Sequence, residues 1–173
     1  RQPGPRWCRS WPAHWPPLLQ RVHAARGSTD AQQALPRLAD LLPFQGMSGI
    51  DAAVDLLQDA ITRDAHIVVV GDYDCDGICS TAIVVQALQV RGGRVSAFLP
   101  SRFTDGYGVN VATVERLAEE GCQMLVTVDC GTSAVEALTV AADLGIDTIV
   151  ADHHLAGGHR PPGIIANPAL GHG

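Results

Sequence analysis

The sequence contains no lysine, no pair of cysteines at C-x-x-C spacing and no apolar run that approaches the length of a membrane helix. Because a membrane-spanning helix needs roughly 20 consecutive apolar residues, we expect a chain that does not cross a membrane. Its five cysteines are an odd number, which argues against a disulfide framework, and their spacing suits no structural zinc site. Cysteines without partners favour a reducing, cytoplasmic compartment.

The chain also lacks an excess of positive charge. Twelve basic residues, all arginine, stand against 18 acidic ones, so the formal net charge is −6. Nucleic-acid-binding domains normally carry a basic patch, and composition alone therefore leaves the substrate open. With 173 residues, of which 46% are hydrophobic and 17% charged, the chain has the size and composition of one ordinary globular domain.

Three parts of the chain differ in pattern. Residues 1–15 are rich in tryptophan and proline without apolar periodicity, and we expect a disordered leader there. Residues 16–65 show the apolar spacing of three and four that is typical of helices. From residue 66 to residue 173, short β-branched runs alternate with helical segments.

These short runs are the predicted strands, and they span residues 66–72, 94–100, 123–129, 147–152 and 163–168. They are apolar on both faces and are separated by helices, a pattern typical of a parallel sheet that is covered on both sides. The sequence therefore predicts a doubly wound α/β fold for residues 66–173, preceded by a helical segment.

The stretch GDYDCDG, residues 71–77, places Asp72, Asp74 and Asp76 at alternate positions directly after the first apolar run. Carboxylates this close repel one another, so we expect a cation among them. An EF-hand calcium loop does not fit, because its twelfth position must be glutamate and Ile83 stands there. A solvated acidic turn is the other interpretation of this stretch taken alone.

Further acidic and imidazole residues follow other predicted strands: Asp129 ends the third, and Asp152, His153 and His154 end the fourth. Ligands of open parallel sheets bind beyond the carboxyl ends of the strands, so these residues should meet the acidic stretch. Carboxylate and imidazole ligands without thiolate favour Mn²⁺ or Mg²⁺, and their number favours two ions. Because neighbouring side chains of an extended segment point in opposite directions, one histidine is expected on metal and the other on substrate.

Three stretches, GDYDCDG (71–77), VTVDCG (126–131) and ADHHL (151–155), resemble the first signature motifs of the DHH phosphoesterases. The segment PSRFTDGYGV (100–109) and the helical lead-in narrow the resemblance to one branch, the exonucleases that digest single-stranded DNA from its 5′ end in DNA repair and recombination. The resemblance runs from about residue 16 to residue 170 and implies a DHH phosphoesterase domain over residues 66–173, truncated at its C-terminal end.

The resemblance implies a metal ligand set. Asp74 and Asp76 would each bind one of two Mn²⁺ or Mg²⁺ ions, Asp129 would bridge both ions and act in catalysis, and His153 would be a further ligand. Some relatives carry a metal-binding histidine where Val70 stands here, so the shell of the first ion would be completed differently. Another metal-binding aspartate is expected beyond residue 173, and we expect the 173 residues alone to be weakly active or inactive.

The same resemblance makes His154 the catalytic contact to the scissile phosphate, with Asp72 and Asp152 in support. In the loop after the second predicted strand, Arg102 is a candidate phosphate contact, with a solvated arginine as the alternative. Tyr107 is a candidate for stacking on a base or sugar, with a packing role as the alternative. Single-stranded DNA is the expected partner, and the resemblance adds a single-strand-binding protein and a helicase.

Two other functions stay open at this point. Another DHH phosphodiesterase, acting on short oligonucleotides or cyclic dinucleotides, would share the metal centre but not the exonuclease-like segments. An aspartyl-phosphate phosphatase would use Asp72 or Asp74 as a nucleophile, since Asp-x-Asp after a first strand also suits that chemistry. A chain that only binds metal or a partner is the non-enzymatic alternative.

Overall fold

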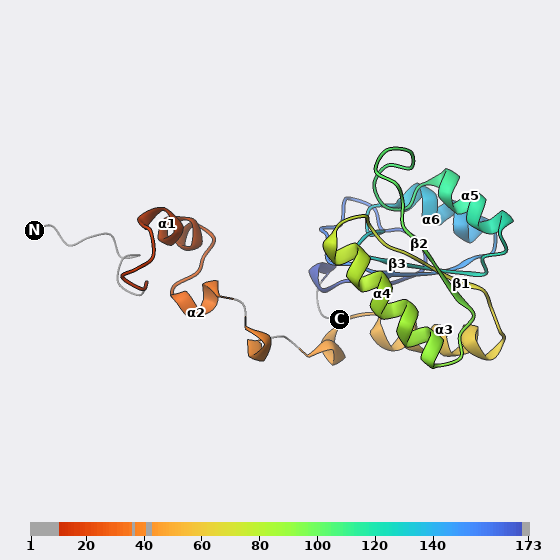
Figure 1. Cartoon of the computed structure of the whole chain (residues 1–173), viewed down its shortest axis with the longest axis horizontal. Helices are drawn as coiled ribbons and strands as arrows, with labels where there is room; N and C mark the ends of the chain where they lie inside the picture. Colours follow the sequence, from red (N-terminus) through yellow and green to blue (C-terminus); the bar gives the residue numbers. More distant parts are fainter. Residues whose placement is uncertain (1–10, 36, 41–42, 171–173) are drawn as a thin grey trace, which may run out of the picture. The chain divides into compact units, whose positions relative to one another are not determined.

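The computed structural model describes residues 11–35, 37–40 and 43–170. The chain divides into two compact units, an N-terminal unit (Arg1–Pro43) and a sheet unit (Phe44–Gly173) (Figure 1). Among the described residues, the N-terminal unit consists of the helices α1 (Pro17–Ala25) and α2 (Ala31–Ala34) and the 3₁₀ turn η2 (Leu38–Asp40).

The end of the predicted leader contacts α1 through aromatic rings. The rings of Trp11 and Trp15 stack with their centroids 5.4 Å apart, and His23 of α1 lies 5.6 Å from Trp15. Trp11 is buried. The leader was predicted over residues 1–15, and its residues 1–10 lie outside the described part of the chain.

The sheet unit alternates helices and strands. Within its described residues, the helices and 3₁₀ turns are η3 (Phe44–Gly46), α3 (Ile50–Thr62), α4 (Cys75–Val90), α5 (Val111–Glu119), α6 (Val135–Asp143) and η4 (Pro168–Leu170). The strands are β1 (Ile67–Val70), β2 (Val95–Phe98), β3 (Met124–Val128), β4 (Asp147–Ala151) and β5 (Ile164–Ala166). Helix α3, which the sequence pattern groups with the N-terminal helices, belongs to this compact unit.

The five strands form one sheet in the order β2-β1-β3-β4-β5, and every neighbouring pair is parallel. All five predicted strands are present, and the prediction of a parallel α/β fold is confirmed. The register pairs Val70 with Thr127 and Val128 with Ala151. Strands β1, β3 and β4 therefore end side by side, and the residues that follow them meet at one edge.

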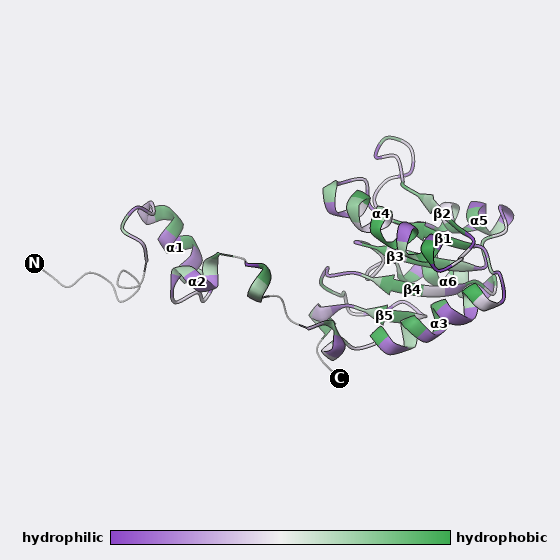
Figure 2. Cartoon of the chain, turned by 60° about the horizontal axis from the view of Figure 1, so that its bottom comes forward, coloured by the Kyte–Doolittle hydropathy of each residue, from purple (hydrophilic) through white to green (hydrophobic). Residues whose placement is uncertain are grey.

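Helices cover both faces of the sheet (Figure 1). Ile67 and Val69 of β1 belong to the core shared with α3 and α4, whereas Val68 and Val70 belong to the core shared with α5 and α6. This alternation follows from the two-residue period of a strand and explains why the run is apolar throughout. Figure 2 shows the same pattern in colour, with hydrophobic strands at the centre of the unit.

The first turn of α4 packs directly on the chain that leaves β1. A Cβ atom added at Gly77 would overlap the backbone of Asp72, so only glycine lets the helix approach this closely. The close approach brings the start of α4 to the sheet edge at which β1, β3 and β4 end.

We predict that Gly77→Ala destabilises the fold by about 1–3 kcal/mol, because the added methyl group forces the helix away from Asp72. A loss of stability would be informative, because helix propensity alone favours alanine over glycine by roughly 1 kcal/mol. Chemical denaturation measures the effect. Gly157→Ala is the matched control, because nothing lies within 4 Å of a Cβ at that position; equal stabilities for the two variants would contradict the packing argument.

Candidate metal centre

The acidic stretch contains the start of a helix. The Oδ1 atom of Asp74 accepts a hydrogen bond from the backbone N–H of Gly77 at 3.1 Å and so caps α4, and Asp76 lies in the first turn. The hydrogen bond from Gly77 and a further one from Asp76 lower the pKa of Asp74. Both exposed carboxylates also face the positive end of the helix dipole, which stabilises their charge.

Asp129 follows β3 in a strained backbone conformation. Its φ angle is 56°, in the left-handed region that residues other than glycine rarely adopt. Its backbone N–H donates to the carbonyl oxygen of Ala151 at 3.0 Å, which continues the sheet pairing by one residue. Burial raises the pKa of the Asp129 carboxyl, and the charges of Asp76 and Asp74 raise it further. Strain of this kind concentrates at functional sites.

Two groups of metal-binding side chains share Asp129. In the first group, ligand atoms of Asp74, Asp76 and Asp129 all lie within 4.8 Å of one another. In the second, ligand atoms of Asp129, Asp152, His153 and His154 do so. The Nε2 atom of His153 lies 3.1 Å from Oδ1 of Asp129. The structure thus brings the predicted ligands together, and the excess negative charge and hard oxygen donors fit two divalent cations.

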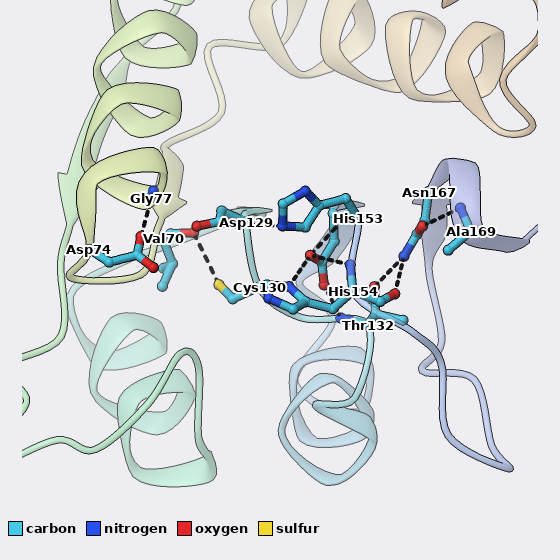
Figure 3. A network of polar contacts seen from close by, with 11 residues as sticks. Val70, Asp74, Gly77, Asp129, Cys130, Thr132, His153, His154, Asn167 and Ala169 are labelled. Atoms are coloured by element: carbon cyan, nitrogen blue, oxygen red, sulfur yellow. Dashed lines mark hydrogen bonds and ion pairs between the residues drawn. The ribbon is translucent and has the colours of Figure 1, made fainter. Parts of the chain in front are cut away.

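Asp152 accepts hydrogen bonds from the loop that carries the histidines. Figure 3 shows His153 and His154 of this loop beside Asp129, with Thr132 and Asn167 close to His154. Its Oδ1 atom accepts from the backbone N–H groups of His153 (2.7 Å) and His154 (3.2 Å), and it lies 2.7 Å from Nδ1 of His154. Its Oδ2 atom accepts from the N–H of Thr132 at 3.0 Å. Burial alone would raise the pKa of Asp152, but the hydrogen bonds from Thr132 and His154 outweigh burial and lower it to about 2. Asp152 is therefore ionised and holds His154 in place.

The two histidine rings do not point in opposite directions, as a continuing strand would require. Their centroids are 4.7 Å apart and their planes meet at 81°, an edge-to-face contact. The reason is that β4 ends at Ala151, and the Asp152 side chain then gathers both backbone N–H groups. His153 still reaches Asp129, while His154 is held through Nδ1 and presents Nε2 away from Asp152.

Two positioning residues were missed from the sequence. Asn167, which follows β5 and is buried, donates through Nδ2 to Oγ1 of Thr132 and to the carbonyl oxygen of His154, both at 2.9 Å, and accepts from the N–H of Ala169. Thr132 follows the turn at Asp129, and its backbone N–H donates to Oδ2 of Asp152. The rule that polar residues at the ends of parallel strands converge at one edge would have pointed to Asn167, which lies near the end of the fifth predicted run.

Asp72 lies apart from both groups of ligand atoms. It is only 2% exposed, and among the described residues its Oδ1 atom has no hydrogen-bond partner. A buried carboxylate is a poor nucleophile toward an incoming phosphate, which argues against Asp72 as the nucleophile of an aspartyl-phosphate phosphatase. The supporting role expected of Asp72 stays a prediction.

A row of ring contacts connects Arg102 and Tyr107 to His154 of the metal centre. The guanidinium carbon of Arg102 lies 5.4 Å from the ring centre of Tyr73. The ring of Tyr73 meets Tyr107 edge-on at 6.4 Å, and Tyr107 meets His154 edge-on at 6.3 Å. Burial, followed by the charge of Asp72, raises the pKa of Tyr107 to about 12, so the hydroxyl stays protonated. The loop after β2 thus borders the site on the His154 side.

The sequence profile of the DHH family, N-terminal domain, matches residues 66–170. The chain belongs to the DHH family. Its relatives include the single-stranded-DNA-specific exonuclease RecJ of Salmonella typhimurium, which is 42% identical over 161 residues, and that of Bacillus subtilis, 37% identical over 153 residues. These matches cover 92% and 86% of this chain, but only 28% and 19% of the relatives.

Solved structures give the same likeness. A RecJ crystal structure bound to manganese superposes with a TM-score of 0.70 at 38% identity, over 75% of this chain and 34% of that one. RecJ from Thermus thermophilus in complex with Mn²⁺ has a TM-score of 0.62 at 34% identity, over 88% and 21%. In the described part of this chain, no helix is both long and apolar enough to span a membrane.

We predict that Asp152→Asn lowers the pKa of His154 in the metal-free protein. The hydrogen bond from Asp152 is the largest cause of the raised pKa of His154, because the carboxylate stabilises the protonated ring. NMR titration of the imidazole resonances measures the change, with His23 of the N-terminal unit as internal reference. An unchanged titration midpoint for His154 would show that Asp152 does not control its protonation.

We predict that Asn167→Ala costs about 1–3 kcal/mol of stability, because it leaves Thr132 and the His154 carbonyl without their buried donor. Denaturant unfolding measures the loss. Thr139→Ala, which removes an exposed hydroxyl from α6, should stay within roughly 0.5 kcal/mol of the parent protein. Similar stabilities for both variants would speak against a structural clamp at Asn167.

Proposed function

We propose that this chain is the metal-binding nuclease part of a RecJ-type exonuclease, which hydrolyses phosphodiester bonds of single-stranded DNA from the 5′ end with two Mn²⁺ or Mg²⁺ ions. The observation that carries the proposal is the position of Asp129 in both groups of ligand atoms. The chain spans less than a third of the length of the relatives named single-stranded-DNA-specific exonuclease, so the activity of the whole protein is inferred from them.

The roles proposed for the carboxylates are those that the family resemblance implies. Asp74 and Asp76 would each hold one of the two ions, Asp129, which stands in both groups of ligand atoms, would serve both, and His153 would be a further ligand. When bound, two divalent ions lower the pKa of a water molecule and neutralise charge that develops on the phosphate. The hydrogen bond from Gly77 to Asp74 and the contact between Nε2 of His153 and Asp129 help to hold these carboxylate oxygens in place.

His154 is the proposed contact to the scissile phosphate. Its Nδ1 is engaged by Asp152, which leaves Nε2 as the free ring nitrogen. The raised pKa of His154 keeps the ring protonated to higher pH than usual, so Nε2–H can donate to a phosphate oxygen. Asp152 supports this role by orienting the ring, and Asn167 supports it by holding the His154 backbone.

Arg102 and Tyr107 are the proposed substrate contacts outside the metal centre. Tyr107 is 54% exposed and touches His154, and Arg102 stacks on Tyr73 two contacts further out. An aromatic ring beside a catalytic histidine suits a base or sugar, and arginine suits the next phosphate. We also propose a cytoplasmic protein that works with a single-strand-binding protein and a helicase in DNA repair, as the exonuclease branch suggests.

We predict that Asp129→Asn in the full-length protein lowers Mn²⁺-dependent digestion of single-stranded DNA by more than about 100-fold. Even residues that only support metal ligands typically cost 10–100-fold when changed, and this residue is proposed to serve two ions. Digestion of 5′-labelled and 3′-labelled oligonucleotides gives both rate and polarity. The matched control is Asp143→Asn, an exposed aspartate at the end of α6.

The proposal fails if the full-length protein, freed of metal and resupplied with Mn²⁺ or Mg²⁺, leaves long single strands intact. Digestion restricted to short oligonucleotides or cyclic dinucleotides would assign the chain to another group of DHH phosphodiesterases. Full activity of the Asp129→Asn variant would refute the shared-ligand role.

A further inference from the structure

Two cysteines near the start of α4 lie on the same side of the helix. Cys75 is the first residue of α4, and Cys79 follows four positions later. Residues at this spacing are neighbours on a helix, with Cβ atoms about 5–6 Å apart. The charge of the Cys79 sulfur, followed by a hydrogen bond with its thiol, raises the pKa of Cys75. The two sulfur atoms therefore lie close together.

Both thiols of this pair are exposed, whereas Cys122 and Cys130 are buried. After Asp76, α4 contains no charged residue and no histidine, so the helix itself offers these sulfur atoms no ion-pair partner. Among the described residues, neither group of ligand atoms at the metal centre includes a cysteine. The thiol pair is therefore a separate set of metal-binding groups that the proposed hydrolysis does not use.

The helical spacing decides which chemistry suits the pair. A disulfide needs Cβ atoms roughly 3.5–4.5 Å apart, so its formation would distort the first turn of α4. A structural zinc ion needs four ligands, and in the described part of the chain no cluster of three or more metal-binding groups contains a cysteine. A soft cation that accepts only two thiolates, one on each side, bridges the wider gap without moving the backbone.

We propose that Cys75 and Cys79 form a second metal site, which binds one cuprous ion, Cu⁺, between two thiolates. Each thiol releases its proton to solvent when its sulfur binds the ion. Soft sulfur ligands select Cu⁺, whereas the hard carboxylate oxygens of the metal centre favour Mn²⁺ or Mg²⁺. The two sites therefore select different ions from the same mixture, although Cys75 stands between Asp74 and Asp76 in the chain.

Competition for Cu⁺ against a chromogenic chelator tests the proposal on the full-length protein, under reducing and oxygen-free conditions. Cys8, which lies outside the described residues, is replaced by serine in every protein compared. We expect the parent protein to take up one more ion than Cys79→Ser, and Cys75→Ser should show the same loss. The affinity of this site should fall by more than about 100-fold, because even groups that only orient a metal ligand contribute 10–100-fold.

Cys79→Ser combined with Ala82→Cys is the matched control. It keeps the number of exposed thiols but places them seven positions, or about 10 Å, apart along α4, which is too far for one ion to bridge. This control should bind Cu⁺ no better than Cys79→Ser alone. X-ray absorption at the copper edge should show two sulfur neighbours in the parent protein.

Equal uptake of Cu⁺ by the parent protein and Cys79→Ser would overturn the proposal, and so would tight binding by the control with separated thiols. Loss of the ion in Asp129→Asn, with the cysteines intact, would assign Cu⁺ to the metal centre instead. Denaturant unfolding of each variant shows that a lost ion is not a lost fold. None of these measurements depends on digestion of DNA, so the copper site and the nuclease function are tested independently.

Discussion

The metal centre depends on the parallel register of β1, β3 and β4. Because Val70 pairs with Thr127 and Val128 pairs with Ala151, the three strands end side by side, although they are far apart along the chain. Apart from Asp147 at the start of β4, these three strands contain no charged residue, and the candidate ligands all follow the strand ends. A slip of one residue in any strand would move its entire set of side chains to the other face. The same strand register therefore fixes both the hydrophobic core and the positions of the residues that follow the strands.

Hydrogen bonds within the site offset part of the repulsion between its carboxylates. Asp74 is stabilised as an anion by its cap and Asp152 by four hydrogen-bond contacts, whereas the Asp129 carboxylate faces Nε2 of His153 at 3.1 Å and accepts no backbone N–H among the described residues. The raised pKa of Asp129 reflects this imbalance, since burial and two neighbouring charges act on it together. A divalent cation beside Asp129 would offset the repulsion from these two neighbouring charges. This division of roles among the carboxylates follows from local hydrogen bonding rather than from residue type.

The sequence was sufficient to predict the parallel sheet and the convergence of the acidic and histidine motifs at one edge. It was not sufficient to predict the hydrogen bonds and ring orientations within the site. Runs such as residues 67–70 indicate buried strands, and the rule for strand ends then brings Asp129 to Asp74 and Asp76. The hydrogen bonds of Thr132 to Asp152 and of Asn167 to Thr132 join residues 20 and 35 positions apart, and no local pattern signals them. The relative directions of the two histidine rings were predicted wrongly, because the alternation of side chains along a strand was extended past Ala151, where β4 ends.

The placement of α4 has a consequence for the order of assembly. Since the helix begins inside the acidic stretch, the partial positive charge of its first turn lies among the carboxylates of the folded chain. We therefore expect the polypeptide to reach its fold without a bound ion, in contrast to small domains in which metal binding and folding are one event. Removal of divalent cations would then empty the metal centre without unfolding the sheet.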